Sequence, residues 1–323
     1  MLSDQETRRR ARLAARGAAR LSGMLSSCVL CPRLCAVDRT RGATGLCRLG
    51  AKARVARFGP VWRDEAPLVG PHGSGTVHFN GCALRCAFCA DAAISQTTSG
   101  REVEPEELAE IFLALQRRGC HNLNLVSPSH VTPAIAAALA IAYEDGLVLP
   151  VVYTSGGYER AEVLAELAGL VDVYLIDFKW GVDRQHSQAP GYNQVCRAAI
   201  REMHRQVGDL VTDHRGLAQR GLMVRHLALP GDLGNARAVA QFLAREISTH
   251  TWCRVLDSYR PVHRAAAVPE LARRTRAAEV EAARQAFRDA GLHRLVSGAG
   301  RRASGLGRPA LVRPGAWGRS TRL

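Results

Sequence analysis

Short apolar runs alternate with longer stretches of helical periodicity from residue 75 to about residue 290. The runs that predict strands are 76–80, 123–126, 149–153, 173–178, 223–229 and 254–258. Helices are predicted between them, from Pro105, from Thr132 as N-cap with Pro133 next, and near 159–169, 192–206, 235–248 and 268–290. Residues 209–221 break the alternation and indicate a hairpin insert. Six strands alternating with helices predict a parallel sheet with right-handed crossovers, either open or closed into a barrel.

The composition is that of a soluble globular protein, with 47% hydrophobic and 23% charged residues. A chain of 323 residues can bury a full core, as one large α/β domain or as two small ones. No apolar run approaches the ~18 residues of a membrane helix, and no Leu-rich segment with a cleavage site follows the N-terminus. We therefore expect a cytoplasmic protein with no membrane partner.

Most of the net charge of +15 lies in two terminal segments. Residues 1–22 contain six Arg against two acids, and residues 292–323 contain seven Arg and no acid. Basic ends can bind nucleic acid, but solvated, disordered ends explain the pattern as well, and we expect no nucleic-acid partner. The predicted organisation is a basic N-terminal arm (1–22, helical or disordered), a Cys-rich metal-binding segment (23–74), a core (75–291) and a basic disordered C-terminal tail (292–323).

Seven of the ten cysteines fall within residues 28–89, in two groups with short spacings. In an intracellular chain such clustering indicates metal binding rather than disulfides. The first group is Cys28, Cys31, Cys35 and Cys47, and its four thiolates can close a tetrahedral site. Structural zinc and an auxiliary iron–sulfur cluster both fit this spacing. Cys120, Cys196 and Cys253 are isolated in sequence and are interpreted as core residues.

The second group is Cys82, Cys86 and Cys89, directly after the strand predicted at 76–80. In alternating α/β folds the reactive site lies at the carboxyl ends of the strands. Gly81 lets the backbone turn sharply there. Three thiolates of a C-x3-C-x2-C loop can bind one cubane cluster and leave its fourth iron open to a substrate or cofactor, whereas a closed structural site uses four ligands.

The spacing C-x3-C-x-aromatic-C, with Phe88 as the aromatic residue, resembles the radical S-adenosylmethionine (SAM) superfamily. The chain is most similar to the branch related to pyruvate formate-lyase activating enzyme, in an uncharacterised subgroup with extra N-terminal cysteines. The matching segments are 28–35, 45–47, 73–82, 124–130, 153–159, 174–179, 200–208 and 221–231. The resemblance implies a partial (β/α)6 barrel of the TIM type, a 4Fe-4S cluster that binds SAM at its open iron, and reductive cleavage of SAM to a 5′-deoxyadenosyl radical. It also implies an external one-electron donor of the flavodoxin or ferredoxin type.

The resemblance assigns roles along the remaining strands. Ser127 and Pro128 occupy the place of a stretch that lines the SAM amino group, and Thr154 and Ser155 that of residues near the ribose. Asp177 and Lys179 match an Asp-x-Lys pair near the SAM carboxylate and methionine end. Their two-residue spacing puts both side chains on one face of the strand.

Two neighbouring residues on the fifth strand, Arg225 and His226, are both candidates to face the pocket. Arg225 and His226 must face opposite sides of a strand. We expect Arg225 to face the pocket, since a guanidinium can pair with a carboxylate through two hydrogen bonds.

Two positions depart from the family pattern. Relatives usually follow the third cluster cysteine with Gln-Asn, whereas this chain has Ala90-Asp91. Relatives also commonly place an Asn or Asp where this chain has Thr154. Both changes weaken assignment of the substrate by analogy.

Three classes of function fit the sequence. The first is an activase that abstracts hydrogen from a backbone glycine of a partner enzyme, which would then be a protein substrate. The second is an enzyme that uses the same radical on a small molecule or a peptide. The third is a non-enzymatic zinc protein that binds nucleic acid through its Arg-rich ends, a class that leaves the matches along six strands unexplained.

Overall fold

Six parallel strands form the centre of the fold in this computed structural model, which describes residues 3–183 and 189–296. They are β2 (Ser74–Phe79), β4 (Leu123–Val126), β5 (Val151–Ser155), β6 (Val173–Asp177), β8 (Ala218–Leu227) and β9 (Trp252–Leu256). These strands lie side by side in this order, and each pair of neighbours is parallel. All six correspond to predicted strands. The short β7 (Val211–Thr212) pairs antiparallel with β8, which confirms the hairpin insert.

The sheet is mostly parallel but open, and both of its edges extend beyond the predicted strands. On one side β1 (Ala53–Val61) pairs antiparallel with β2, and β3 (Arg101–Val103) pairs antiparallel with β1. On the other side β10 (Leu295–Val296) pairs parallel with β9. The α/β class is therefore confirmed, in a form consistent with a radical SAM barrel that does not close. Because β1 belongs to this sheet, part of the segment 23–74 lies in the core sheet rather than outside it, which corrects the expected boundary at residue 75.

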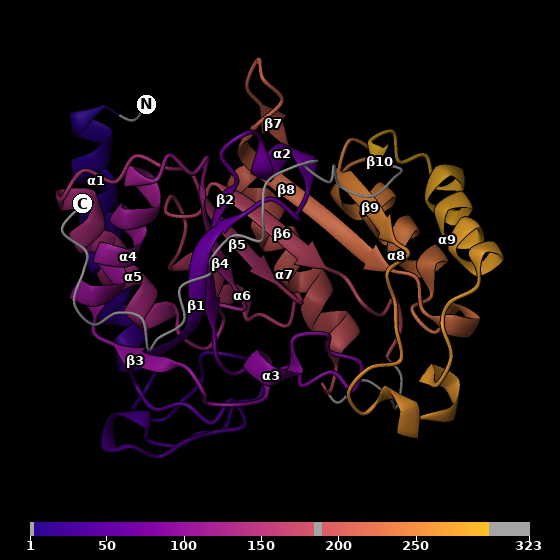
Figure 1. The fold of residues 1–323 in the computed structure, drawn as a ribbon, viewed down its shortest axis with the longest axis horizontal. Coiled ribbons are helices and arrows are strands. Elements are labelled where there is room, and N and C mark those ends of the chain that lie inside the picture. The colour runs from indigo at the N-terminus through magenta and orange to yellow at the C-terminus, as the bar shows by residue number, and fades with distance from the viewer. Residues whose placement is uncertain (1–2, 184–188, 297–323) are drawn as a thin grey trace.

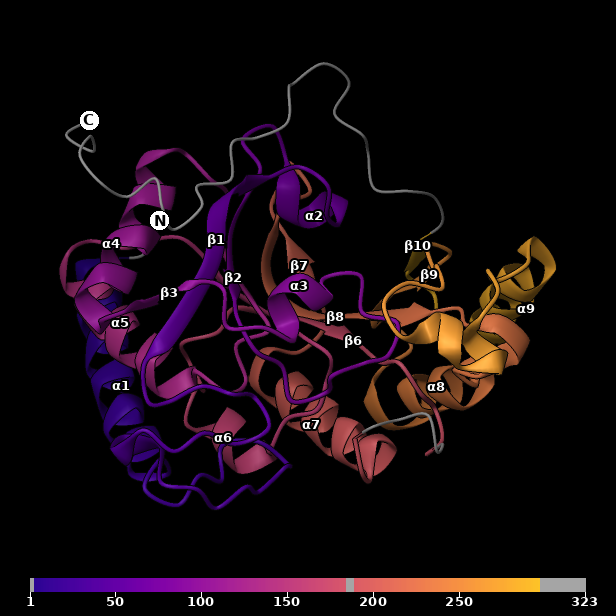
Figure 2. The same ribbon diagram turned by 60° about the horizontal axis from the view of Figure 1, so that its bottom comes forward.

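Helices cover the convex face of the sheet (Figures 1 and 2). They are α4 (Pro105–Arg117), α5 (Thr132–Glu144), α6 (Ala161–Ala165), α7 (Tyr192–Val207), α8 (Ala236–Phe242), which continues as a π-helical turn over Leu243–Ile247, and α9 (Ala277–Asp289). The start of α4 at Pro105 is as predicted, whereas the N-cap of α5 is Val131 and Thr132 is its first residue. Alternate strand residues such as Val77, Leu125 and Ile176 join the helices in the main hydrophobic core.

The other face of the sheet has a smaller core of its own. It is formed by strand residues that alternate with those of the main core, namely Val152, Val173, Leu175, Met223 and Trp252. Leu68 of the short helix α2 (Ala66–Val69) packs among them. Since α2 directly precedes β2, it closes the concave face at the amino ends of the strands (Figure 1).

The N-terminal segment is a packed helix, α1 (Asp4–Gly23), which lies against α5. Its buried residues Ala11, Ala14, Gly17 and Leu21 recur every three or four positions and form one face. A side chain at Gly17 would come within 2.7 Å of the carbonyl oxygen of Glu166. The expectation of a disordered arm at 1–22 is therefore wrong, and the helical alternative holds.

The expected C-terminal tail is part of the fold at its start. Leu292 is buried and β10 extends the sheet, so the tail does not begin at residue 292. The rest of that segment lies outside the described residues. Among the described helices, none combines the length and the apolar character needed to cross a bilayer.

Arg10 ties α1 to the sheet, and its removal should destabilise the protein. Its guanidinium donates to both carboxylate oxygens of Asp172 at 2.6 and 2.9 Å. Both side chains are nearly buried, at 11% and 12% exposure. Arg10→Ala should lower the free energy of unfolding by roughly 1.5–3 kcal/mol, because a carboxylate loses a charged partner.

Urea unfolding with Arg9→Ala as the matched control tests this prediction. Arg9 is 51% exposed and pairs with Glu6 of the same helix, so its loss should change the free energy by less than about 1 kcal/mol. Equal losses in the two variants would show that α1 does not stabilise the fold through Asp172.

Candidate active site

The second cysteine group lies at the carboxyl end of β2, as predicted, in a turn that Asn80 holds in place. The buried Asn80 side chain donates to the carbonyl of Ile94 at 3.0 Å and accepts from the amide of Gly100 at 2.9 Å. Gly81 has φ of 81°, and a side chain there would come within 2.8 Å of the carbonyl oxygen of Cys47. Only glycine meets both conditions without strain. The backbone therefore leaves the strand in one defined direction.

An aromatic cluster fixes the Cys82–Cys89 loop against the sheet. The ring of Phe88 is buried and packs edge-on against Trp180 and Tyr259, with ring centroids 5.7 Å apart in each pair. Trp180 follows Lys179, so the aromatic residue of the cysteine motif contacts the neighbour of a predicted SAM-binding residue. Burial raises the pKa of the Cys86 thiol to about 12. Lys179 acts in the opposite direction, and a cation bound to the sulfur would stabilise the thiolate further.

Asp177 connects the two predicted cations at the carboxyl ends of β6 and β8. It accepts from Arg225 Nε at 2.7 Å and from Lys179 Nζ at 3.0 Å. Burial alone would raise the pKa of Asp177, but Arg225 and Lys179 outweigh it and hold the pKa well below its ordinary range. Burial would lower the pKa of Lys179, whose side chain is 15% exposed, but the same carboxylate, with Cys86 and Cys89, keeps that pKa above its usual value. Lys179 is therefore a charged side chain close to the cysteine loop.

Arg225 and His226 face opposite sides, and the side of Arg225 is the one we expected. The imidazole of His226 is buried on the convex side, where Nδ1 lies 2.8 Å from the carbonyl oxygen of Phe178 and the ring lies 5.8 Å from that of Phe287. Arg225 instead faces the concave side with Asp177. Lys179, Asp177 and Arg225 thus form a row of cation, carboxylate and cation, which we call the charged row.

Sequence reasoning missed three further charged residues that belong to this row. They are Asp64, Glu65 and Arg254. Asp64 accepts from Arg225 at 3.3 Å, and Glu65 accepts from Arg254 at 2.5 Å. Asp64 also accepts from the side chain of Asn124 on β4 at 3.3 Å. Both acids come from the turn before α2, in the segment that the sequence assigned outside the core. The sequence signal was local only: Glu65 precedes Ala66-Pro67 at the start of a helix.

The residues expected near the SAM amino group and ribose lie at the ends of β4 and β5. Ser127 has φ of 56° and its amide donates to the carbonyl of Thr154, so the backbone turns sharply after β4. The Thr154 hydroxyl donates to Asn124 at 2.7 Å and thus joins the charged row. The Ser155 hydroxyl accepts from the amide of Gly157 at 3.1 Å and holds the next turn. Pro128 follows Ser127, and Asp91 is exposed, 3.5 Å from Arg57.

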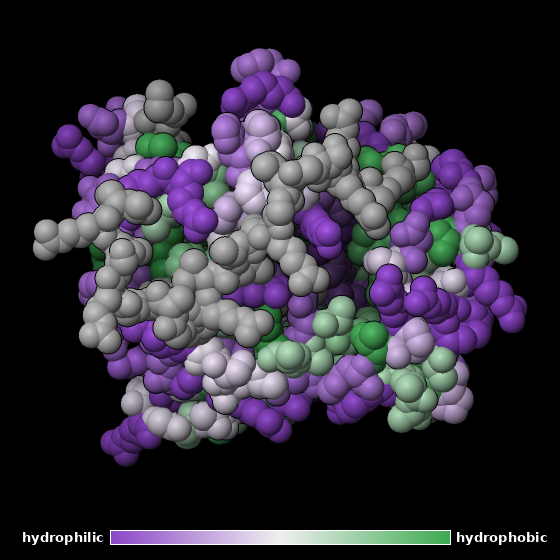
Figure 3. Space-filling model, viewed as in Figure 1, coloured by the Kyte–Doolittle hydropathy of each residue, from purple (hydrophilic) through white to green (hydrophobic). Residues whose placement is uncertain are grey.

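The concave face is therefore divided into two layers. The apolar residues around Leu68 fill the amino ends of the strands, and the charged row occupies the carboxyl ends beside the cysteine loop. Figure 3 shows hydrophilic side chains in a hollow near the centre of this face. Asp177 keeps 26% of its side chain exposed, so the row is accessible at the cysteine end. An anionic or zwitterionic ligand can bind there through Lys179.

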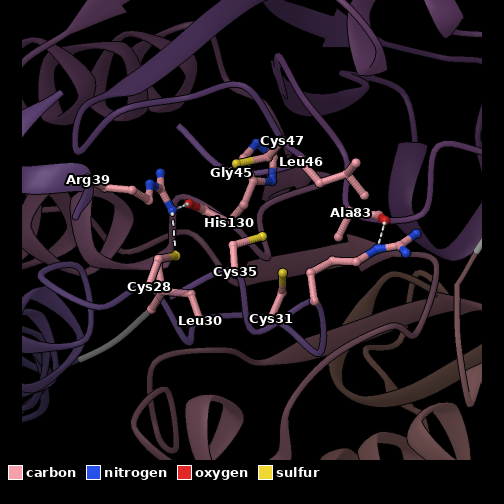
Figure 4. Close-up of a pocket in the computed structure, with 11 residues that line it drawn as sticks. Cys28, Leu30, Cys31, Cys35, Arg39, Gly45, Leu46, Cys47, Ala83 and His130 are labelled. Atoms are coloured by element: carbon pink, nitrogen blue, oxygen red, sulfur yellow. Dashed lines mark hydrogen bonds between the residues drawn. The ribbon is translucent and has the colours of Figure 1, made fainter. Parts of the chain in front are cut away.

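The first cysteine group is brought together as well. Cys28, Cys31, Cys35 and Cys47 line a single pocket whose wall also includes Arg39, Ala83 and His130 (Figure 4). As they stand among the described residues, no three His, Cys, Asp or Glu side chains are grouped to hold a metal ion. The three remaining cysteines, Cys120, Cys196 and Cys253, are buried.

Two comparisons with known proteins bear on this site. Residues 76–213, from β2 to β7, match the model of the radical SAM superfamily. An uncharacterized protein of Methanocaldococcus jannaschii is 26% identical over 268 residues, which cover 80% of this chain and 74% of the relative. The chain thus contains a radical SAM superfamily domain that includes the cysteine loop, Asp177 and Lys179. Proteins with such a domain are generally redox enzymes that use a 4Fe-4S cluster and SAM.

The residues present fit these two groups. The domain supplies three thiols on one loop, and a charged lysine lies beside them. The match accounts for the similarities on the strands within residues 76–213, which a non-enzymatic zinc protein would leave unexplained. Neither comparison addresses the narrower resemblance to activating enzymes.

Asn80→Ala should loosen the cysteine loop. It removes both hydrogen bonds of the Asn80 side chain and leaves the amide of Gly100 without its acceptor, at a cost of about 1–3 kcal/mol in the free energy of unfolding. Anaerobically reconstituted protein should also retain less iron, because Cys82 lies two residues further along the chain. Urea unfolding and iron analysis after gel filtration measure the two effects.

Asn122→Ala is the matched control. Asn122 is also buried and makes two side-chain hydrogen bonds, to Leu68 and Ser74, but lies at the amino end of β4. It should cost similar stability and leave the iron content unchanged. If both variants held iron equally well, Asn80 would have no specific effect on the cysteine loop.

Proposed function

We propose that this protein is a radical SAM enzyme whose cluster is held by Cys82, Cys86 and Cys89. When bound, the cluster supplies the electron that cleaves SAM to methionine and a 5′-deoxyadenosyl radical, which takes a hydrogen atom from a substrate. The observation that carries the proposal is the placement of three thiols on one loop at a strand end, beside Lys179, in a domain that matches the superfamily.

The chain's own residues position SAM in this proposal. Lys179 pairs with the carboxylate of SAM, and Asp177 orients Lys179 while Arg225 holds Asp177 from the other side. Positioning matters more than acid–base strength here, since the reaction needs electron transfer to the sulfonium rather than a proton. The carbonyls around Ser127 and Pro128 would face the amino group, and Thr154 and Ser155 would lie on the ribose side.

The substrate we propose is a backbone glycine of a partner enzyme, as the resemblance to activating enzymes implies, in the cytoplasm and with a flavodoxin- or ferredoxin-type electron donor. A small molecule or a peptide is the alternative substrate class. A gene for a glycyl radical enzyme beside this one would support the first class. The proposal includes a second metal centre, iron–sulfur or zinc, at Cys28, Cys31, Cys35 and Cys47.

Changing Cys82, Cys86 and Cys89 together to Ala should abolish reductive cleavage of SAM. The reason is that three thiolates of one loop hold the cluster, so no reducible iron remains beside SAM. The measurement is the yield of 5′-deoxyadenosine from anaerobically reconstituted protein with dithionite. Cys120→Ala, which removes a buried thiol outside both groups, should cleave SAM as the unmodified protein does. Cleavage by the triple variant at the unmodified rate would refute the proposed function.

Lys179→Ala should weaken SAM binding about ten- to a hundredfold, while the iron content stays unchanged. A charge-assisted contact in a desolvated site contributes ~1.5–3 kcal/mol, which sets this range. Lys179→Arg should restore binding only in part, because a planar guanidinium does not fit a site built for a point charge. Equilibrium dialysis on protein with full cluster occupancy measures the affinity.

The second lysine provides the control for this variant. Lys52 is exposed and pairs with Glu104 at the surface, so Lys52→Ala should bind SAM normally. If Lys179→Ala and Lys52→Ala bound SAM with equal affinity, Lys179 would not contact the ligand.

A further inference from the structure

The backbone between Cys28 and Cys47 is wound so that its four cysteines face one pocket (Figure 4). Cys28 exchanges backbone hydrogen bonds with the following loop, donating to Val37 at 2.9 Å and accepting from Ala36 at 3.1 Å. Leu34 and Ala36, on either side of Cys35, have φ of 45° and 53°. Such values are unfavourable for residues with a side chain and persist only where the surroundings impose them. The loop is therefore shaped around the pocket that its thiols line.

A buried cation lies in the same pocket. Arg39 is 1% exposed, and its guanidinium donates to the carbonyls of Gly50 and His130 and to the sulfur of Cys28, at 3.6 Å. Within residues 3–183 and 189–296, no carboxylate pairs with it. Burying an unpaired charge is costly, so a counter-charge is expected in contact with Arg39. Metal-bound thiolates at Cys28 and its neighbours would supply that negative charge.

We infer that Cys28, Cys31, Cys35 and Cys47 ligate an iron–sulfur cluster and that Arg39 is its buried counter-ion. This inference rests on the proposed function and specifies its second metal centre, choosing an iron–sulfur cluster over zinc. A zinc ion requires four sulfurs about 2.3 Å from one point. The four thiols line one cavity together with Ala83, and Ala83 belongs to the segment 76–213 that matches a superfamily of iron–sulfur enzymes, which favours a cluster over zinc.

The cluster site shares a wall with the Cys82–Cys89 loop. Ala83 of that loop lines the pocket, and its carbonyl accepts from Arg33 at 2.8 Å. From the other side Arg85 donates to the carbonyl of Leu46 at 3.3 Å. His130, whose carbonyl accepts from Arg39, has its Nε2 2.6 Å from the carbonyl oxygen of Asn80. Ligation at the first cysteine group therefore fixes the segment that supports the second.

Metal analysis of the variant with Cys82, Cys86 and Cys89 changed to Ala tests this inference without any measurement of SAM cleavage. After anaerobic reconstitution with iron and sulfide, it should retain iron and acid-labile sulfide in equal amounts, about two or four of each per chain. Adding Cys35→Ser and Cys47→Ser should remove both. Adding Cys120→Ser and Cys253→Ser, which replaces two buried thiols outside the pocket, should remove neither.

Each other result contradicts the inference in a distinct way. Iron and zinc both absent from the triple variant, in protein whose circular dichroism is that of the folded chain, would show that the four cysteines bind no metal. One zinc per chain without sulfide would show a structural zinc site. The experiment measures metal and sulfide and not SAM cleavage. Its result therefore tests this inference separately from the proposed cleavage of SAM, and either one could fail while the other holds.

Arg39→Gln in the same background tests the counter-ion. A chelator should remove the cluster several-fold faster from this variant than from the protein that keeps Arg39. Arg39→Lys keeps the charge and should therefore lose the cluster more slowly than Arg39→Gln. The matched control is Arg10→Gln, which removes another nearly buried arginine, one that pairs with Asp172. It should lower the free energy of unfolding and leave the rate of cluster loss unchanged. Equal rates in Arg39→Gln and Arg10→Gln would rule out Arg39 as the counter-ion.

Discussion

A charge buried inside a sheet must have a partner, and this constraint organises the carboxyl ends of the strands. Arg225 on β8 can face the concave side because Asp177 on β6 and Asp64 before α2 both accept from it. Arg254 on β9 depends in the same way on Glu65. The two acids of the α2 turn must therefore reach the concave face, and this requires β1, α2 and β2 to follow one another along the same edge. Pairing of charges thus links the N-terminal half of the chain to the site.

The cysteine loop depends on a different kind of constraint, which is shape. Gly81 has no room for a side chain because the carbonyl of Cys47 lies behind it, and Phe88 fits between Trp180 and Tyr259. These contacts hold the loop from the outside, while Lys179 approaches its thiols from the concave side. A ligand with a carboxylate can then meet a cation beside the cysteine loop.

Much of the site could be predicted because it follows local rules. The six parallel strands have compact apolar runs, and the spacing of Asp177 and Lys179 decides their common face. β1 escaped prediction because Arg54, Arg57 and Gly59-Pro60 dilute its apolar alternation. The packed face of α1 is mostly small residues, Ala11, Ala14 and Gly17 with Leu21, among many arginines, so the sequence left a helix and a disordered arm both open. Asp64 and Glu65 join the site through Asn124, 60 residues away, and through arginines about 160 to 190 residues away, and no local pattern carries that information.

Four arginines of this chain that have little exposed surface show how a missing partner can be informative. Arg10, Arg225 and Arg254 each contact a carboxylate within hydrogen-bonding distance. Arg39 is more buried than any of these and donates to carbonyl oxygens and a cysteine sulfur. Carbonyl oxygens satisfy its N–H groups but carry no net charge, so they do not offset the cost of burying the cation. The cluster inferred above would supply the counter-charge, because Arg39 and the four cysteines line the same pocket.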